Sequence, residues 1–181
     1  MALTRLNNQA LTSITSAGLP SGTVLQVKTA TKTDTQSTTS NSFEDITGLS
    51  VSITPASISS KIMVFCSVFM STSFYWTPLR ILRDSTQINA PNAAGSNRKL
   101  VNACGSTQTY GTYMPQSVNV SALDSPSSTS AVTYKAQFCV LLASTTTYKT
   151  YVNITERDED NAAGGYDVRG SSSLTVMEIA G

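Results

Sequence analysis

One stretch of the sequence, residues 61–71 (KIMVFCSVFMS), is apolar on both sides of the strand that it predicts. Successive side chains of a strand point to opposite faces of its sheet. One face therefore carries Ile62, Val64, Cys66, Val68 and Met70, and the other carries Met63, Phe65 and Phe69. A small β-sandwich buries only one face of each sheet, so the second face needs another layer or another subunit. We expect Met63, Phe65 and Phe69 to lie at a subunit interface.

The chain after residue 22 predicts further strands. In LSVSIT, residues 49–54, apolar and hydroxyl residues alternate as in a half-buried strand. Strands are predicted at residues 23–31, 43–47, 49–54, 61–71, 117–123, 131–142, 147–154 and 174–179, with a hairpin at 78–88 that turns at Asp84 and Ser85. Loops are predicted at residues 32–40 and 155–170, and residues 90–111 are predicted to be a long loop or a set of short irregular strands. About eight or nine strands separated by turn signals favour an all-β sandwich or jelly roll over a βαβ fold.

Residues 1–22 predict an N-terminal arm. Its apolar residues are few and separated by polar ones. It ends at Leu19-Pro20-Ser21-Gly22, a segment that interrupts regular secondary structure. These apolar residues are Leu3, Leu6, Leu11 and Ile14. Their spacing fits a short helix or an extended strap that docks on a neighbour, and a lone helix of this length is marginal in water. We expect residues 1–22 to anchor the chain to a partner and residues 23–181 to form the β-domain.

The composition bounds the possible partners. Charged residues make up 13% of the chain and the net charge is +1, so no broad positive field would attract phosphates. We therefore expect no contact with nucleic acid. The N-terminus lacks the continuous apolar stretch of a signal peptide, and no run of about 18 apolar residues follows, so we expect neither secretion by that route nor membrane insertion.

Histidine is absent, which excludes His-based catalytic triads and His-containing zinc sites. The cysteines Cys66, Cys104 and Cys139 are odd in number, widely spaced and without a C-x-x-C motif, so they indicate neither a disulfide framework nor a zinc site. Cys66 and Cys139 fall within apolar strand patterns and are expected to be free buried thiols. One disulfide bond between two of the three cysteines is the alternative.

Residues 156–160 (ERDED), with Asp167 nearby, form the densest group of charges. Their spacing lacks the alternating oxygen ligands, central glycine and distal glutamate of an EF-hand. A solvated loop is the expected structure, with no metal and no cofactor. A pair of acids such as Asp158 and Glu159 would also suit a polysaccharide depolymerase, which needs a fixed carboxylate separation in a substrate cleft. We expect no catalytic site.

Aromatic residues offer another kind of contact. The run Phe74-Tyr75-Trp76 could stack on a sugar ring, and Tyr110 and Tyr113 fall at the end of a long predicted loop and just after it. Packing in the core or at an interface is the alternative for these residues. We expect Tyr110 and Tyr113 to be possible surface contacts, because long loops often carry binding residues.

An ordered series of motifs over residues 21–181 is similar to a known family. The series is SGTVLQVKTATKTDTQSTTSNSFEDITGLSVSITPASISSKIMV, then LRDST, LDSPSSTSAVTYKAQ and the terminal SSSLTVMEIAG. It resembles the C-terminal jelly-roll module of tail fibres and related capsid or tail appendage proteins of tailed bacteriophages. The resemblance implies a trimeric β-sandwich head on the exterior of the virion, with a role in attachment or architecture.

Together these observations lead us to expect a non-enzymatic virion structural protein. With only a 22-residue arm before the module, a short fibre, a knob or a capsid-decoration protein fits better than a long fibre. The expected partners are two further copies in a homotrimer and other virion proteins contacted through the arm. The alternative is a receptor-binding module that holds a host surface glycan in its loops.

Overall fold

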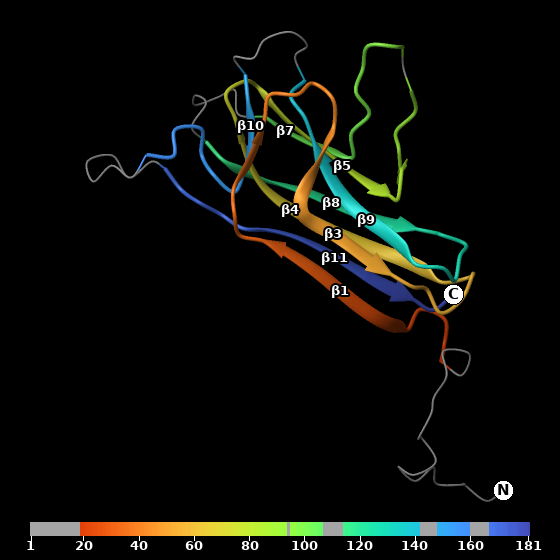
Figure 1. Cartoon of the computed structure of the whole chain (residues 1–181). Helices are drawn as coiled ribbons and strands as arrows, with labels where there is room; N and C mark the ends of the chain where they lie inside the picture. Colours follow the sequence, from red (N-terminus) through yellow and green to blue (C-terminus); the bar gives the residue numbers. More distant parts are fainter. Residues whose placement is uncertain (1–18, 94, 107–113, 142–147, 160–166) are drawn as a thin grey trace, which may run out of the picture.

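The computed structural model describes residues 19–93, 95–106, 114–141, 148–159 and 167–181. In these residues the protein is all-β, and two antiparallel sheets lie face to face, as Figure 1 shows. The predicted β-sandwich is thus confirmed.

The first sheet, sheet A, has four long strands side by side in the order β1-β11-β4-β8. These strands are β1 (Val24–Lys32), β11 (Ser172–Ile179), β4 (Lys61–Thr72) and β8 (Gln116–Asp124). The end of β4 also pairs with the short strand β10 (Thr150–Val152), which in turn pairs with β2 (Gln36–Thr38). All of these pairings are antiparallel.

The second sheet, sheet B, has the order β3-β9-β5. Its strands are β3 (Glu44–Ile53), β9 (Val132–Phe138) and β5 (Trp76–Arg83). Beyond β5 lie two short strands, β6 (Thr86–Gln87) and β7 (Ala103–Ser106), which pair with its two ends. Strand orders β1-β11-β4-β8 and β3-β9-β5-β7 are those of an eight-stranded jelly roll. The sequence pattern had predicted this architecture.

One apolar core fills the space between the sheets. The inward apolar side chains of β4 are all buried, and they are Ile62, Val64, Cys66, Val68 and Met70. They face buried residues of sheet B that include Leu49, Val51, Ile53, Leu79, Ile81, Tyr134 and Phe138. The alternation in residues 49–54 and 61–71 therefore assigned the inward faces correctly.

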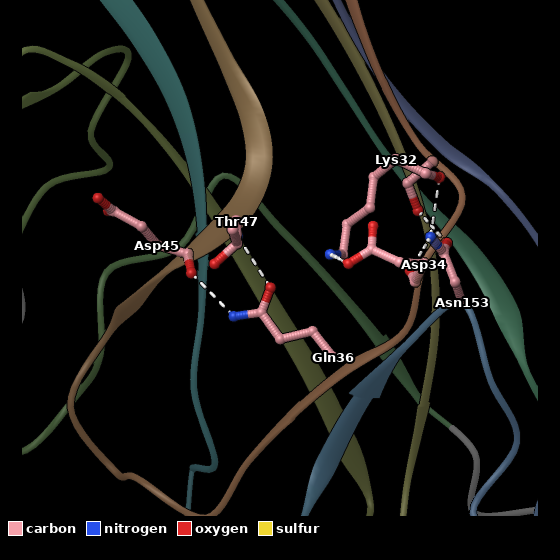
Figure 2. Close-up of polar contacts among 7 residues, drawn as sticks. Lys32, Asp34, Gln36, Asp45, Thr47 and Asn153 are labelled. Atoms are coloured by element: carbon pink, nitrogen blue, oxygen red, sulfur yellow. Dashed lines mark hydrogen bonds and ion pairs between the residues drawn. The ribbon is translucent and has the colours of Figure 1, made fainter.

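Strand β3 contains an irregularity at Gly48, where φ is +86°. The pairing with β9 shifts register between Asp45 and Ser50, and as a result Ile46 and Leu49 are both buried although they are three residues apart. The side chain of Gln36 in β2 bonds the backbone there, as Figure 2 shows. Its Nε2 donates to Asp45 O (3.0 Å), and its Oε1 accepts from Thr47 N (2.8 Å).

Asn153, directly after β10, ties four segments together, and Figure 2 shows its bonds to Lys32 and Asp34. Its Nδ2 donates to the carbonyl oxygens of Lys32 (2.9 Å) and Asp34 (3.0 Å), and its Oδ1 accepts from Ser172 Oγ (2.6 Å). Its backbone N–H donates to Phe69 O (2.8 Å). The φ of Asn153 is +63°, a conformation that asparagine adopts more readily than most residues. This buried side chain fixes the end of sheet A where β2 and β10 join it.

The ends of the β-domain lie together at the opposite end of sheet A. Ala180 N donates to Thr23 O (2.8 Å), and Gly22 N donates to Ala180 O (2.8 Å). The strand β4 begins at this end, where Lys61 pairs with Ile179. Near the same end Tyr134 Oη donates to Asp124 Oδ2 (2.7 Å) and links sheet B to β8.

Two short strands lie in segments with little strand pattern. β2 lies within residues 32–40, so the loop predicted there was wrong in part, whereas β7 within 90–111 agrees with the second alternative, short irregular strands. β2 has three residues and β7 has four, too few to show a period in a polar sequence. The predicted turn at Asp84 and Ser85 is present, and Asp84 adopts φ +53°.

Candidate functional site

The outward face of sheet A can be built residue by residue from its register. Residues directly opposite each other in an antiparallel ladder point to the same face. Met177 pairs with both Val27 and Met63, and Met63 pairs with Leu123 on its other side. One row of four apolar side chains therefore crosses β1, β11, β4 and β8 on the side away from the core.

Neighbouring rows extend this apolar surface. Val24 pairs with Ile179 in the row nearer the chain ends, and Phe65 stands in the row on the other side. We define the apolar face as Val24, Val27, Met63, Phe65, Leu123, Met177 and Ile179. Four of these side chains are prominently exposed: Val24 49%, Val27 53%, Phe65 43% and Leu123 46%.

Lys61 is the single charged residue among those that point outward from the four long strands of sheet A. It lies at the rim, and its Nζ donates to Ser125 Oγ (3.2 Å). A contiguous apolar surface that crosses four strands of a sheet marks an interaction site more often than an ordinary solvent face. The arrangement therefore suits a contact with another apolar surface.

A shallow hollow of about 280 Å³ adjoins Phe65 on the same side of the sheet. Its outward lining consists of small hydroxyl and amide residues of three strands, namely Ser67, Asn119, Ser121, Ser173 and Thr175. The hollow forms because these short side chains stand next to a phenylalanine that projects from the sheet. A bulky side chain from another surface could fill it.

The outward face of sheet B has the opposite character. Asp45 accepts from Lys135 Nζ (2.8 Å) and from Gln137 Nε2 (2.5 Å), and Gln137 Oε1 accepts from Arg80 Nε (2.8 Å). Partial burial would raise the pKa of Asp45, but the bonds from Lys135 and Gln137 hold this pKa below its usual value. The Arg80 guanidinium also lies over the Phe43 ring, 4.0 Å from its centroid. This face is a bonded polar surface suited to water.

The three residues predicted for an interface behave differently. Phe65 is exposed and Met63 is half-buried, and both belong to the apolar face. Phe69 packs within the chain, because a Cβ on Gly170 would lie 2.5 Å from Phe69 Cγ. The sequence pattern did not single out Leu123, Met177 or Ile179, because only the strand register shows that they join Met63 and Phe65.

The predicted acidic loop is partly described, and Asp160 lies outside the described residues. The Asp158 carboxylate accepts hydrogen bonds from Arg169 Nε (2.9 Å) and Arg169 Nη2 (2.6 Å). Asp167 forms an ion pair with Arg157 (3.2 Å). Within the described ranges no group of three or more Asp, Glu, Cys or His residues is arranged to hold a metal. Asp158 and Asp167 instead form ion pairs that join the two ends of the loop.

All three cysteines are free. Cys66 and Cys139 are buried, which confirms the prediction made for them, and Cys104 is exposed. Burial raises the pKa of Cys66 to about 12 and that of Cys139 to about 11. At neutral pH both buried thiols are therefore protonated and poor nucleophiles.

The aromatic run covers the end of the turn between β4 and β5 and the first residue of β5. The rings of Phe74 and Tyr75 are 4.5 Å apart, and those of Phe74 and Tyr148 are 4.6 Å apart. Tyr75 is 44% exposed and Trp76 is 42% exposed. Neither residue belongs to the apolar face.

Several predicted residues fall outside the described part of the chain. They are the arm residues Leu3, Leu6, Leu11 and Ile14, and the loop residues Tyr110 and Tyr113.

A scan against models of known protein families and a search of curated proteins both find no match to this chain. Within the described residues no helix is long and apolar enough to cross a membrane.

Proposed function

We propose that this chain is a non-enzymatic structural protein of a tailed-bacteriophage virion, which assembles as a homotrimer through the apolar face of sheet A. The virion part of the proposal is supported by the motif series over residues 21–181. The assembly part is supported by the strand register, which places Met63 and Phe65 in a wider apolar surface. The arm, residues 1–22, would contact other virion proteins.

The observation that carries the proposal is the contrast between the two outer faces. Sheet B presents charged and amide side chains bonded to one another, whereas sheet A presents an apolar row across four strands. A monomer in water would be expected to show polar side chains on both outer faces of an antiparallel sandwich. The contrast therefore supports a covered sheet A and an exposed sheet B.

The exposed apolar side chains supply a substantial part of the free energy that an assembly needs. Burying a whole apolar side chain contributes about 1.5–3 kcal/mol, so covering the exposed half of Val24, Val27, Phe65 or Leu123 contributes about 1 kcal/mol each. Three chains gain roughly 12 kcal/mol in this way, of the same order as the cost of bringing them together. The loss of one of these side chains should then shift the assembly measurably.

Substitution of Phe65 by serine tests the assembly. Phe65 is the better choice than Phe69, because Phe69 packs on Gly170 within the chain and its loss would also weaken the fold. Three lost contacts of about 1 kcal/mol each should raise the trimer dissociation constant roughly a hundredfold. Light scattering coupled to size exclusion should show wild type at three times the chain mass and Phe65→Ser shifted towards the monomer.

The matched control is Val168→Ser. Val168 is 46% exposed, close to the exposure of Phe65, but lies outside sheet A in the predicted acidic loop. Its substitution should leave the mass unchanged. A monomeric wild type, or a Phe65→Ser variant that stays trimeric, would contradict the assembly proposal.

The virion role has its own test. An antibody raised against the folded domain should label intact particles of the phage that encodes the chain, at fixed positions on the capsid or tail. Mass spectrometry of purified particles should find the chain in a stoichiometric amount. Its absence from purified particles would refute the virion role even if the trimer exists.

A further inference from the structure

Strand β8 forms one edge of sheet A. It pairs with β4 on one side, and no described strand pairs with it on the other. Among the described residues, the backbone of residues 117–123 has one bond outside the ladder, from Asn119 Nδ2 to Ser117 O (3.3 Å). Every second residue of an antiparallel strand directs its N–H and C=O away from its partner strand. The edge of β8 therefore offers backbone donors and acceptors to another strand.

The opposite edge of sheet A is closed, and β8 lacks comparable protection. At that edge β1 lies against β3, where Gln26 Nε2 donates to Thr54 O (2.8 Å) and Lys28 Nζ donates to Ser52 O (3.0 Å). The sequence of residues 117–123, SVNVSAL, contains no charged residue and no proline. Charged residues and proline are the features that commonly keep an exposed edge from pairing.

The two ends of β8 are held by sheet B, which leaves its middle open. At the first residue, Gln116 Nε2 donates to a threonine hydroxyl of β5 (3.3 Å). At the last residue, Asp124 Oδ2 accepts from Arg83 Nη1 (2.6 Å). The open stretch is therefore residues 117–123, with Val120 at its centre.

This stretch is complementary to itself when two copies run antiparallel about a two-fold axis at Val120. Such an axis puts Asn119 opposite Ser121 of the second copy, and Val118 opposite Ala122. Val118, Val120 and Ala122 are buried residues on the inward side, so the pairing would extend the apolar core. On the outward side an amide would meet a hydroxyl group, which can form a hydrogen bond across the strands.

The end of the strand favours the same register. With the axis at Val120, Asp124 lies opposite Gln116 of the second copy, and a carboxylate can accept from an amide. An axis at Ser121 would instead bring the carboxylate opposite Val118. A shift of one residue would place the inward side of one copy beside the outward side of the other.

We propose that residues 117–123 of β8 pair antiparallel with the same residues of a second copy, so that sheet A continues across a two-fold axis at Val120. The backbone groups of a sheet bond within its plane, whereas its side chains stand perpendicular to that plane. Covering the apolar face would therefore leave this edge open. The pairing goes beyond the proposed trimer and does not depend on it, and with both contacts formed it would join chains of two trimers.

Mixed cysteine variants of the full chain test the pairing. Asn119→Cys and Ser121→Cys would each be made with Cys104→Ser, which removes the exposed thiol and leaves two buried ones. Positions 119 and 121 of paired copies would have Cα atoms about 4.5–5.5 Å apart, within reach of a disulfide, whereas two copies of position 119 would be about 7–8 Å apart. With oxygen as the oxidant, the mixture should form a covalent dimer about ten times faster than either variant alone.

A mixture of Ser117→Cys and Asn119→Cys is the register control, because these positions are four residues out of register and should gain nothing from mixing. The double variant Asn119→Cys/Ser121→Cys reports the symmetry. A two-fold contact places both bridges between the same two chains, so only dimers should form, whereas a three-fold contact at these positions would link three chains.

Faster cross-linking of the first mixture, with products of two chains on a non-reducing gel, would support the pairing. Equal rates for the mixture and the single variants, faster cross-linking of the register control, or three-chain products from the double variant would overturn it. These rates do not depend on the mass of the wild-type assembly, so the result is separate from the test of the trimer.

Discussion

The carboxylate of Glu178 is buried at the end of the core, on the inward side of β11. Its Oε2 accepts from Gln26 Nε2 (2.6 Å), and its Oε1 accepts from Ala56 N (2.6 Å). Burial alone would raise the pKa of Glu178, but these hydrogen bonds hold this pKa below its usual value. The ionised form therefore ties β1 and the segment after β3 to β11.

Glu178→Gln should lower the free energy of unfolding by about 1.5–3 kcal/mol at pH 7, because one charge-assisted bond is lost. The folded pKa lies below the unfolded one, so the contribution of Glu178 is complete above about pH 4.3 and is lost as pH falls through the lowered value. The difference between wild type and Glu178→Gln should accordingly shrink in acid. Urea unfolding at pH 7 and pH 3 measures it, and a pH-independent difference would contradict the assignment.

Individual positions show where the sequence was and was not sufficient. The alternation around Phe65 correctly separated its inward neighbours from its outward ones. The same alternation assigned Phe69, like Phe65, to the predicted subunit interface. Nothing in the local sequence shows that Gly170 packs against the Phe69 ring. That contact joins residues one hundred positions apart, and strand periodicity carries no information about such contacts.

Among the strands, β3 depends on a side chain from another strand. The Gln36 amide replaces part of the ladder where β3 shifts register, since it bonds both Asp45 O and Thr47 N. Gln36→Ala should destabilise the protein by about 1 kcal/mol, because both bonds are partly exposed to water. Hydrogen exchange at the Thr47 amide should become faster by a larger factor than exchange elsewhere in β3.

Gln36→Glu is the matched variant. Its carboxylate can still accept from Thr47 N but cannot donate to Asp45 O, so the protection of the Thr47 amide should be largely kept. Equal exchange at Thr47 in wild type and Gln36→Ala would show that the bond to Gln36 does not protect this amide.

Long strands were predictable and short ones were not. Strands β4 and β8 were found to within one residue at each end, because nine or more residues give a clear period. Strands β2 and β7 exist because a longer strand or a neighbour offers free backbone groups to pair with. Their own residues, QST and ACGS, contain no strand signal.

For the assembled molecule, the nature of the apolar face predicts its response to salt. Lys61 is the single charge on the outward side of the four long strands, so screening has little to weaken there, and high salt favours apolar burial. The trimer fraction should stay constant or rise between about 0.05 and 1 M NaCl. Sedimentation velocity measures this fraction, and dissociation at high salt would locate the contact on charged surfaces such as sheet B.

The arrangement of the whole chain shows the limits of local patterns most clearly. The strand count and composition predicted a sandwich or jelly roll, and the jelly-roll order was found. That order depends on the pairing of β1 with β11, the first and last strands, and no period in the sequence encodes it. The apolar face has the same origin, because Val27 and Leu123 share a row only through β11 and β4.

The hydrogen bonds between Thr23 and Ala180 have a practical consequence for engineering. A passenger peptide fused after Gly181 would start beside Gly22 and Thr23, at the first strand of the domain. A graft in the turn at residues 73–76 would sit about 35 Å away, at the far end of β4. Display of foreign epitopes on this scaffold should therefore use that turn, and purification tags at the C-terminus should be removable.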